Sequence, residues 1–213
     1  MSFFKNIFNK EKPEVRQLTS PAQLKINDII VLNDSFALPE TLRGQQFQVT
    51  AVNCYEFEHN VQTEWGLKND QNQTIYLTLD IDDETYLKFA LEIEHEDVET
   101  LFDLDDFATI FEEPGEAFLE KKQDTEHTKQ WTSEQYQQCV FAKVGYFHRK
   151  DNRCENISNL EGKDAGEQFE LYQLLNQDES QGIDIEVWED GDTDVFLTLY
   201  RPLTDIIDIY PGS

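Results

Sequence analysis

The sequence contains few cysteines, and their arrangement excludes two classes of small protein. Cys54, Cys139 and Cys154 are widely spaced and form no CxxC pair. A disulfide framework or a four-cysteine zinc site is therefore not expected. Long apolar runs are also missing, because none approaches the ~18 residues of a membrane span. The first residues contain no continuous apolar stretch before a small-residue cleavage site, so we expect no secretory signal and predict a cytoplasmic location.

Basic residues are scarce as well. The chain of 213 residues has 17 Lys and Arg against 44 Asp and Glu, which gives a formal net charge of -27. A surface of that charge repels nucleic acids and anionic lipid headgroups over about a Debye length, so direct nucleic-acid binding is not expected. It favours cationic partners, such as basic proteins, polyamines and divalent metals. The alternative is that the charge serves solubility alone.

Motifs of known chemistry are missing, although aromatic residues are abundant. The sequence has no GxSxG elbow, Walker loop, GxGxxG turn or HExxH pair. We therefore predict no catalytic residue, no cofactor and no metal ligand. Residues 190–194 alternate acids as a calcium loop does, but Val195 stands where that loop needs glycine, and Asp190-Gly191 predicts a hairpin turn instead. The aromatic fraction of 12% indicates a folded core rather than a disordered acidic tail.

Residues 1–12 form a segment whose charge differs from that of the rest. Phe3, Phe4, Ile7 and Phe8 fall on one face of a helix, with lysines beside them. A short basic amphipathic helix can lie at a membrane surface or in the groove of a partner. We expect these four side chains to act as an apolar anchor. The alternative is that the helix packs against the acidic domain of its own chain.

Short apolar or alternating segments, separated by turns, predict β-strands. They are 29–32, 47–51, 65–67, 74–79, 86–93, 138–147, 169–175, 183–187, 195–200 and 206–210. Their spacing is typical of a small antiparallel sheet or a partly open barrel. Gly145 predicts a β-bulge. Residues 65–79 resemble residues 188–199. Each stretch contains a tryptophan, a polar turn and then a run of one apolar residue, one aromatic residue and Leu-Thr-Leu. This resemblance indicates an internal duplication; the alternative is that two hairpins are alike by chance.

Residues 94–116 are strongly acidic, with ten Asp or Glu and no Lys or Arg. Their apolar residues fall largely on helical spacing, and Pro114-Gly115 ends the pattern, so we predict one amphipathic helix with an acidic outer face. We expect this face to bind a basic protein surface. Its candidate residues are Glu94, Glu96, Asp97, Glu99, Asp103, Asp105, Asp106, Glu112 and Glu113.

The expected fold is α+β and mostly β, with two antiparallel sheet or partly open barrel units. The first unit, with the acidic helix, covers residues 13–116, and the second covers residues 133–213. A polar linker over 117–132 joins them.

Three stretches of sequence resemble the YjfK-like family of uncharacterised acidic bacterial proteins. They are the opening Met-Ser-Phe-Phe-Lys-Asn-Ile-Phe, the block Leu-Lys-Ile-Asn-Asp-Ile-Ile-Val at 24–31, and the tail Leu-Thr-Leu-Tyr-Arg-Pro-Leu at 197–203 with a terminal Ile-Tyr-Pro. The resemblance covers nearly the whole chain and carries over no catalytic residue. It implies a genetic context with a phage-shock-protein-A-like membrane-remodelling protein and an ATP-grasp enzyme related to glutathionylspermidine synthesis, and hence a role in envelope stress.

Charge and resemblance together predict a non-enzymatic adaptor, cytoplasmic or peripheral to the inner membrane, that binds a basic surface of a membrane-associated protein. Two alternatives remain. The first is a DNA mimic that inhibits a nucleic-acid-binding protein through its carboxylates. The second is an enzyme or binder for polyamine-like cations, which requires a deep pocket with inward-facing carboxyl groups of shifted pKa.

Overall fold

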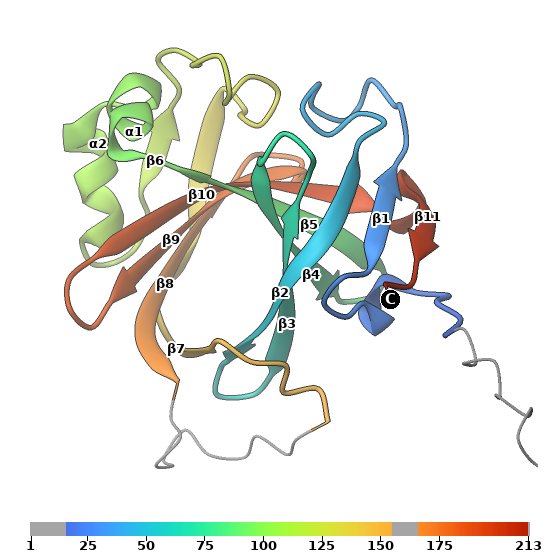
Figure 1. Ribbon diagram of the computed structural model, residues 1–213. Coiled ribbons are helices and arrows are strands. Elements are labelled where there is room, and N and C mark those ends of the chain that lie inside the picture. The colour runs from blue at the N-terminus through green and yellow to red at the C-terminus, as the bar shows by residue number, and fades with distance from the viewer. Residues whose placement is uncertain (1–15, 155–165, 213) are drawn as a thin grey trace, which may run out of the picture.

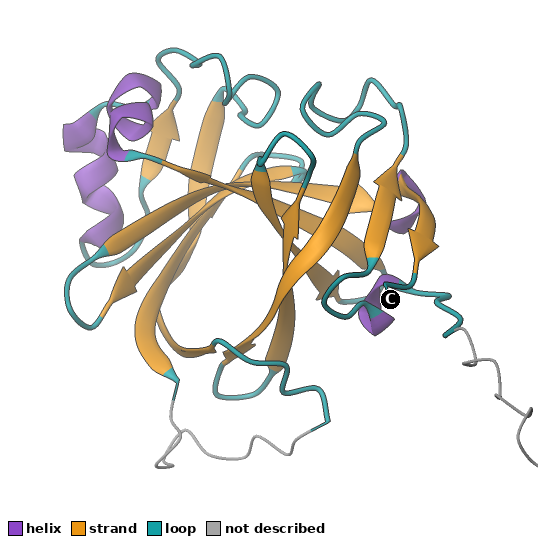
Figure 2. Ribbon diagram, viewed as in Figure 1, coloured by secondary structure: helices purple, strands orange, loops and turns teal. Residues whose placement is uncertain are grey.

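The computed structural model describes residues 16–154 and 166–212, and these form one antiparallel sheet of eleven strands with short helices beside it (Figure 1, Figure 2). The strands are β1 (Ile29–Leu32), β2 (Gln46–Glu56), β3 (Val61–Lys68), β4 (Thr74–Ile81), β5 (Thr85–Ile93), β6 (Phe118–Glu120), β7 (Gln135–His148), β8 (Glu167–Leu175), β9 (Gln181–Trp188), β10 (Thr193–Pro202) and β11 (Ile206–Tyr210). The helical elements are η1 (Pro21–Gln23), α1 (His95–Leu101), α2 (Leu104–Ala108), η2 (Thr109–Phe111) and η3 (Leu203–Asp205). The prediction of a mostly β, antiparallel fold is confirmed.

Eight of the described strands close into a ring. Neighbours run β2-β3-β4-β5-β10-β9-β8-β7, and residues 54–56 of β2 then pair with residues 146–148 of β7. We call this last pairing the seam. β1 and β11 extend the sheet beyond β2, and β6 extends it beyond β7. The ring therefore consists of two consecutive meanders, β2–β5 and β7–β10, which meet at the β5–β10 pair and at the seam.

The two predicted β-rich units share this one sheet. β5 pairs with β10, from Ile93 opposite Val195 to Tyr86 opposite Pro202, and β1 pairs with β11. The predicted linker contributes β6 and the fully buried Trp131. The sequence repeat aligns β3 and β4 with β9 and β10. β3 and β4 are the second and third strands of the first meander, whereas β9 and β10 are the third and fourth strands of the second meander. The meanders correspond in topology, and the repeat does not align equivalent strands.

The acidic segment 94–116 is broken, so the prediction of one continuous helix is wrong. α1 ends at Leu101, and Phe102 takes an extended conformation that turns its ring into the core against Tyr136. Asp103 then caps α2 by accepting a hydrogen bond from the backbone N–H of Asp105. An aspartate at this position starts a new helix because its side chain satisfies a free N–H group.

The position of the bulge in β7 also differs from the prediction. The register of β7 against β8 shifts between Gln138 and Lys143, and Ala142 has a positive φ of 47°. Gly145 has another role, because a Cβ atom there would lie 2.6 Å from Cζ of Phe169. Glycine is required at this position for the close approach of that ring.

The two faces of the curved sheet differ in polarity. In β5, Leu87, Phe89 and Leu91 belong to the main apolar core, which α1 and α2 help to build. Lys88 and Ala90, which alternate with them, face the hollow inside the ring. Because side chains alternate along a strand, the ring strands seal the core with one face and line a cavity with the other.

Candidate functional site

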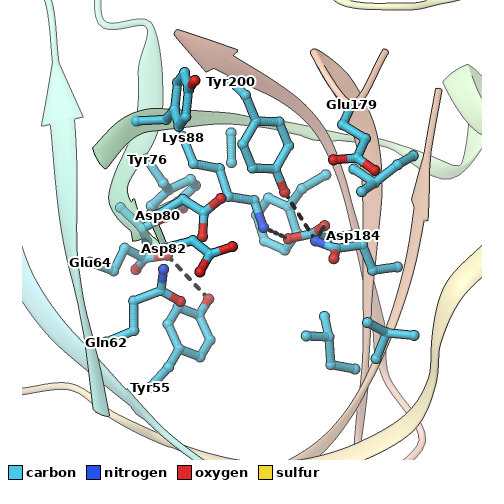
Figure 3. A pocket seen from close by; sticks show the side chains of 18 of the residues that line it. Tyr55, Gln62, Glu64, Tyr76, Asp80, Asp82, Lys88, Glu179, Asp184 and Tyr200 are labelled. Atoms are coloured by element: carbon cyan, nitrogen blue, oxygen red, sulfur yellow. Dashed lines mark hydrogen bonds and ion pairs between the residues drawn. The ribbon is translucent and has the colours of Figure 1, made fainter. Parts of the chain in front are cut away.

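The ring encloses a cavity of about 590 Å³ (Figure 3). This volume lies within the roughly 300–1,000 Å³ that is typical of small-molecule sites. Every strand of the ring contributes at least one lining side chain, since the inward positions of the pleat point into the cavity. Among the described residues, nine carboxyl groups and two lysine ammonium groups line it. The cavity is therefore strongly acidic.

Exposed carboxylates surround the entrance of the cavity. They come from the end of β4, the β4–β5 turn and the β8–β9 turn, and we call them the rim. The rim consists of Asp80, Asp82, Asp83, Glu84, Asp178 and Glu179. Figure 3 shows Asp82 and Glu179 on different sides of the cavity. A cation that approaches the cavity meets a negative potential from both turns.

Deeper in the cavity, a lysine and an aspartate neutralise each other. Lys88 Nζ forms an ion pair with Asp184 Oδ2, and the same nitrogen lies 5.6 Å from the ring centroid of Tyr200. Asp184 Oδ1 accepts a hydrogen bond of 2.8 Å from Gln173 Nε2, which also reaches the Tyr200 hydroxyl at 3.2 Å. We call these four residues the lysine network. The ammonium of Lys88 and the carboxylate of Asp184 therefore compensate each other's charge without a ligand.

The pKa of Lys88 reflects this pairing. Burial lowers the pKa of the amine, but the charge of Asp184, the neighbouring Tyr200 and the hydrogen bonds to both outweigh it, so the net pKa is raised. Lys88 is therefore protonated at neutral pH and is not a nucleophile.

Two other carboxyl groups in the cavity have no such partner. Glu64 of β3 and Glu186 of β9 are each 5% exposed, and we call them the carboxyl pair. Glu64 Oε2 accepts a hydrogen bond of 3.1 Å from the Tyr55 hydroxyl, and Glu64 Oε1 accepts one of 3.0 Å from Asn53 Nδ2. Burial raises the pKa of the Tyr55 hydroxyl, and the charge of Glu186 also acts on Tyr55 and raises this pKa further. Within residues 16–154 and 166–212, no Lys, Arg or His forms an ion pair with either carboxyl.

The surroundings favour the neutral form of the carboxyl pair. Burial raises the pKa of Glu186 well above its ordinary value, and the charge of Glu64 raises it further. Burial also raises the pKa of Glu64, although the hydrogen bonds from Asn53 and Tyr55 oppose this shift. The pair therefore retains a proton at a higher pH than an exposed glutamate does. Two interacting carboxyls of this kind titrate as a unit.

Aromatic rings complete the cavity wall. Phe169 packs edge-on against Tyr55 and Phe57, with ring centroids 5.5 Å and 5.9 Å away. Lys143 Nζ lies 4.2 Å from the ring centroid of Phe57. Both lining lysines of the described chain thus place an ammonium group near an aromatic ring, which is a favourable arrangement for cations.

The acidic residues that the sequence predicts as a partner site lie on and around α1 and α2, away from the cavity lining (Figure 1). Eight of them are exposed, namely Glu94, Glu96, Glu99, Asp103, Asp105, Asp106, Glu112 and Glu113. Asp97 differs, because it is 7% exposed and lies 3.0 Å from His127 Nε2. Its carboxylate also accepts a hydrogen bond from the Glu94 backbone N–H, so Asp97 has a structural role at the start of α1.

The predicted anchor residues Phe3, Phe4, Ile7 and Phe8 lie outside the described residues. No helix in the part of the chain that the structure describes is long and apolar enough to span a membrane. In the same residues, no group of three or more His, Cys, Asp or Glu side chains is arranged to hold a metal ion.

Sequence reasoning did not identify the residues of the cavity. Lys88 and Glu186 alternate with apolar residues in the predicted strands, and alternation alone predicts that such positions face solvent. Glu64 precedes the predicted strand 65–67, and β3 begins earlier, at Val61. One signal was available, because Lys88 lies in the middle of an apolar and aromatic run at 86–93. A charged residue in such a place indicates either an edge strand or a polar interior.

Comparisons of the chain with protein-family models, with curated proteins and with solved structures gave no match. The resemblance to the YjfK-like family therefore stays a prediction, and the function is inferred from the geometry of the cavity.

Proposed function

We propose that the protein binds a polyamine-like organic cation in the cavity of the ring. The observation that carries this proposal is the carboxyl pair, Glu64 and Glu186. Both groups are buried beside a cavity of about 590 Å³. Neither forms an ion pair with a Lys, Arg or His of the described residues, and the nearby Lys88 is already paired with Asp184. A buried carboxylate without a counter-charge is costly, so a site of this kind favours a ligand that supplies the charge.

The expected gain from a ligand ammonium is substantial. An ammonium about 4 Å from one carboxylate is attracted by about 4 kcal/mol at an effective dielectric constant of about 20. A neutral ligand of the same shape gains none of this energy. The cavity should therefore discriminate strongly between an amine and the corresponding alcohol.

The lysine network shows how this cavity holds an ammonium group. Lys88 Nζ lies against a carboxylate, Asp184, and near a tyrosine ring, Tyr200. The carboxyl pair offers the same elements, with Tyr55 as its hydroxyl donor and aromatic neighbour. It differs in that the ammonium has to come from a ligand.

The rim supports a ligand with more than one positive charge. Its carboxylates lie on exposed turns, whereas the carboxyl pair is buried within the ring. A linear polyamine could place one ammonium at the carboxyl pair and another at the rim. A compact amine could occupy only one of these positions, and should bind more weakly.

The test is isothermal titration calorimetry of the full chain with spermidine, with butylamine and with 1,8-octanediol. We expect spermidine to bind more tightly than butylamine, and the diol not to bind. Glu64→Gln should weaken spermidine binding at least tenfold. The matched control is Glu189→Gln, which removes an exposed carboxylate outside the cavity and should leave the affinity unchanged. Equal affinity for spermidine and the diol, or no binding of either, would contradict the proposal.

A second candidate function concerns a different surface. We propose that the eight exposed acidic residues around α1 and α2 bind a basic surface of a membrane-associated protein, in the cytoplasm or at the inner membrane. The supporting observation is their exposure, since none of the eight lines the cavity. The two functions are compatible, because the surfaces are separate.

A further inference from the structure

The Tyr55 hydroxyl donates its proton to Glu64 Oε2 at 3.1 Å. The charge of the second member of the carboxyl pair, Glu186, also acts on this hydroxyl. A phenol has a single proton to donate. Burial and the two acidic neighbours raise the pKa of Tyr55 well above its ordinary value, so the phenol stays protonated. The Tyr55 proton serves one carboxyl at a time, and the other needs a proton of its own or a cation.

The groups that face the carboxyl pair add negative charge on balance. β2 contributes Tyr55 and Asn53, β4 Tyr76, β5 Lys88 and Glu92, β9 Asp184 and β10 Asp194. The cavity wall also contains Lys143 of β7 and the uncharged Phe169 and Leu171 of β8. Lys88 is already paired with Asp184, and Lys143 lies over the ring of Phe57. No histidine lines the described cavity. Repulsion between carboxylates therefore favours a protonated carboxyl within the pair when no ligand is bound.

We infer that a ligand ammonium enters the carboxyl pair in exchange for a proton, so that binding releases a proton to solvent and weakens as the pH falls. This inference rests on the proposed function. One carboxylic acid of the pair loses its O–H proton to water, and its oxygen keeps the electron pair as a carboxylate. An ammonium N–H of the ligand then donates to that oxygen. The charges balance, since the released proton leaves with the positive charge that the ammonium brings in.

Proton exchange makes the cavity a pH-dependent binding site. A single competing proton lowers the apparent affinity by up to about tenfold for each pH unit below the pKa of the pair. Two competing protons would give a steeper dependence. Without the exchange, the affinity would be constant over the same range.

The experiment is calorimetric titration of the full chain with spermidine between pH 5.5 and 7.0, where the ligand keeps its full charge. Each pH is measured in two buffers with different heats of ionisation, such as phosphate and HEPES at pH 7.0. We expect the observed binding heat to differ between the buffers in proportion to the released protons, and the affinity to fall toward pH 5.5. Equal heats in both buffers with constant affinity would overturn the inference and leave the proposed function intact. No binding heat in any condition would overturn both.

Two variants locate the proton. Glu186→Gln replaces one acid by an amide that resembles its neutral form, so it preserves the packing and should reduce proton release by at least half. Glu84→Gln removes a rim carboxylate that is exposed, so it should weaken spermidine binding but leave the released proton unchanged. Unchanged release in Glu186→Gln, or a loss in both variants, would contradict the assignment to the carboxyl pair.

Discussion

Replacement of Lys88 by methionine should strongly destabilise the fold. The Lys88 and Asp184 side chains are 14% and 12% exposed, so the ion pair is largely removed from water. In hydrogen-bond contact at about 2.8 Å, such a pair gains about 6 kcal/mol at an effective dielectric constant of about 20. Asp184 would keep its hydrogen bond from Gln173, which recovers part of this energy. We therefore expect Lys88→Met to lower the free energy of unfolding by about 3–5 kcal/mol.

The assay is urea unfolding monitored by tryptophan fluorescence, with thermal unfolding as a second readout. For a domain of this size, about 3–5 kcal/mol corresponds to a fall in Tm of about 6–20 °C. The raised pKa of Lys88 fixes the pH dependence. Its contribution is fully present below the ordinary lysine value of 10.5 and is lost only as the pH rises through the higher folded-state value. The effect of the variant should therefore be the same at pH 6 and pH 9.

Two further variants test the reasoning. Lys129→Met removes a lysine that is 56% exposed from a pair with Glu126, and should leave the free energy of unfolding nearly unchanged. The double variant Lys88→Met with Asp184→Leu removes both buried charges and should recover much of the lost stability. A cost for Lys88→Met no larger than that for Lys129→Met would refute the argument that the lysine network is a buried, mutually dependent pair.

Two other predictions follow from the structure and a third from the sequence. The folded-state pKa of Glu186 is raised, so its contribution to stability is present below the ordinary glutamate value of 4.5 and is lost as the pH rises through the folded-state value. Urea titrations should therefore show that Glu186→Gln stabilises the unliganded protein more at pH 8 than at pH 5. An equal effect at both would contradict this. Gly145→Ala should lower the free energy of unfolding by about 1–3 kcal/mol, because the new Cβ would lie 2.6 Å from the Phe169 ring. Gly191→Ala lies in open space, although at a φ of 95°, and should perturb the fluorescence of the cavity wall less than Gly145→Ala does. Deletion of residues 1–12 should weaken sedimentation with anionic vesicles or with a membrane-associated partner and leave the unfolding midpoint unchanged, whereas unchanged association would contradict the anchor hypothesis.

The strands were predictable because their signals are local. Alternation at 183–187 corresponds to β9, and the Asp190-Gly191 turn joins β9 to β10 with a φ of 95° at the glycine. These features depend on neighbours along the chain, which the sequence displays directly. The break at Phe102 was not predictable in this way. Its cause is the burial of the ring against Tyr136, and only the tertiary fold brings those two residues together.

The cavity could not be predicted because the alternation of polar and apolar residues does not show whether the polar face of a strand meets solvent or a polar cavity. Glu186 alternates with apolar residues of β9, as a solvent-facing residue of a two-layer protein does. Only closure of the ring turns that face inward. Closure depends on pairing between residues 54–56 and residues 146–148, and no local pattern in the sequence specifies it. The polyamine alternative required a pocket with inward-facing carboxyls, but the sequence indicated neither that the chain has one nor which residues would form it.

The seam has a consequence for the order of folding. Each meander is built from hairpins of neighbouring strands, and such local contacts form early because their loop-closure entropy is small. The seam joins segments far apart in the chain, and its buried pair of Glu56 and His148 is separated by 92 residues. The β5–β10 pair is also long-range, since it joins Ile93 to Val195 and Tyr86 to Pro202. We therefore expect both pairings to form after the hairpins. The seam pairs three residues and the β5–β10 pair eight, so the amide hydrogens of the seam should exchange with solvent first. The cavity would then exist only after both long-range pairings have formed.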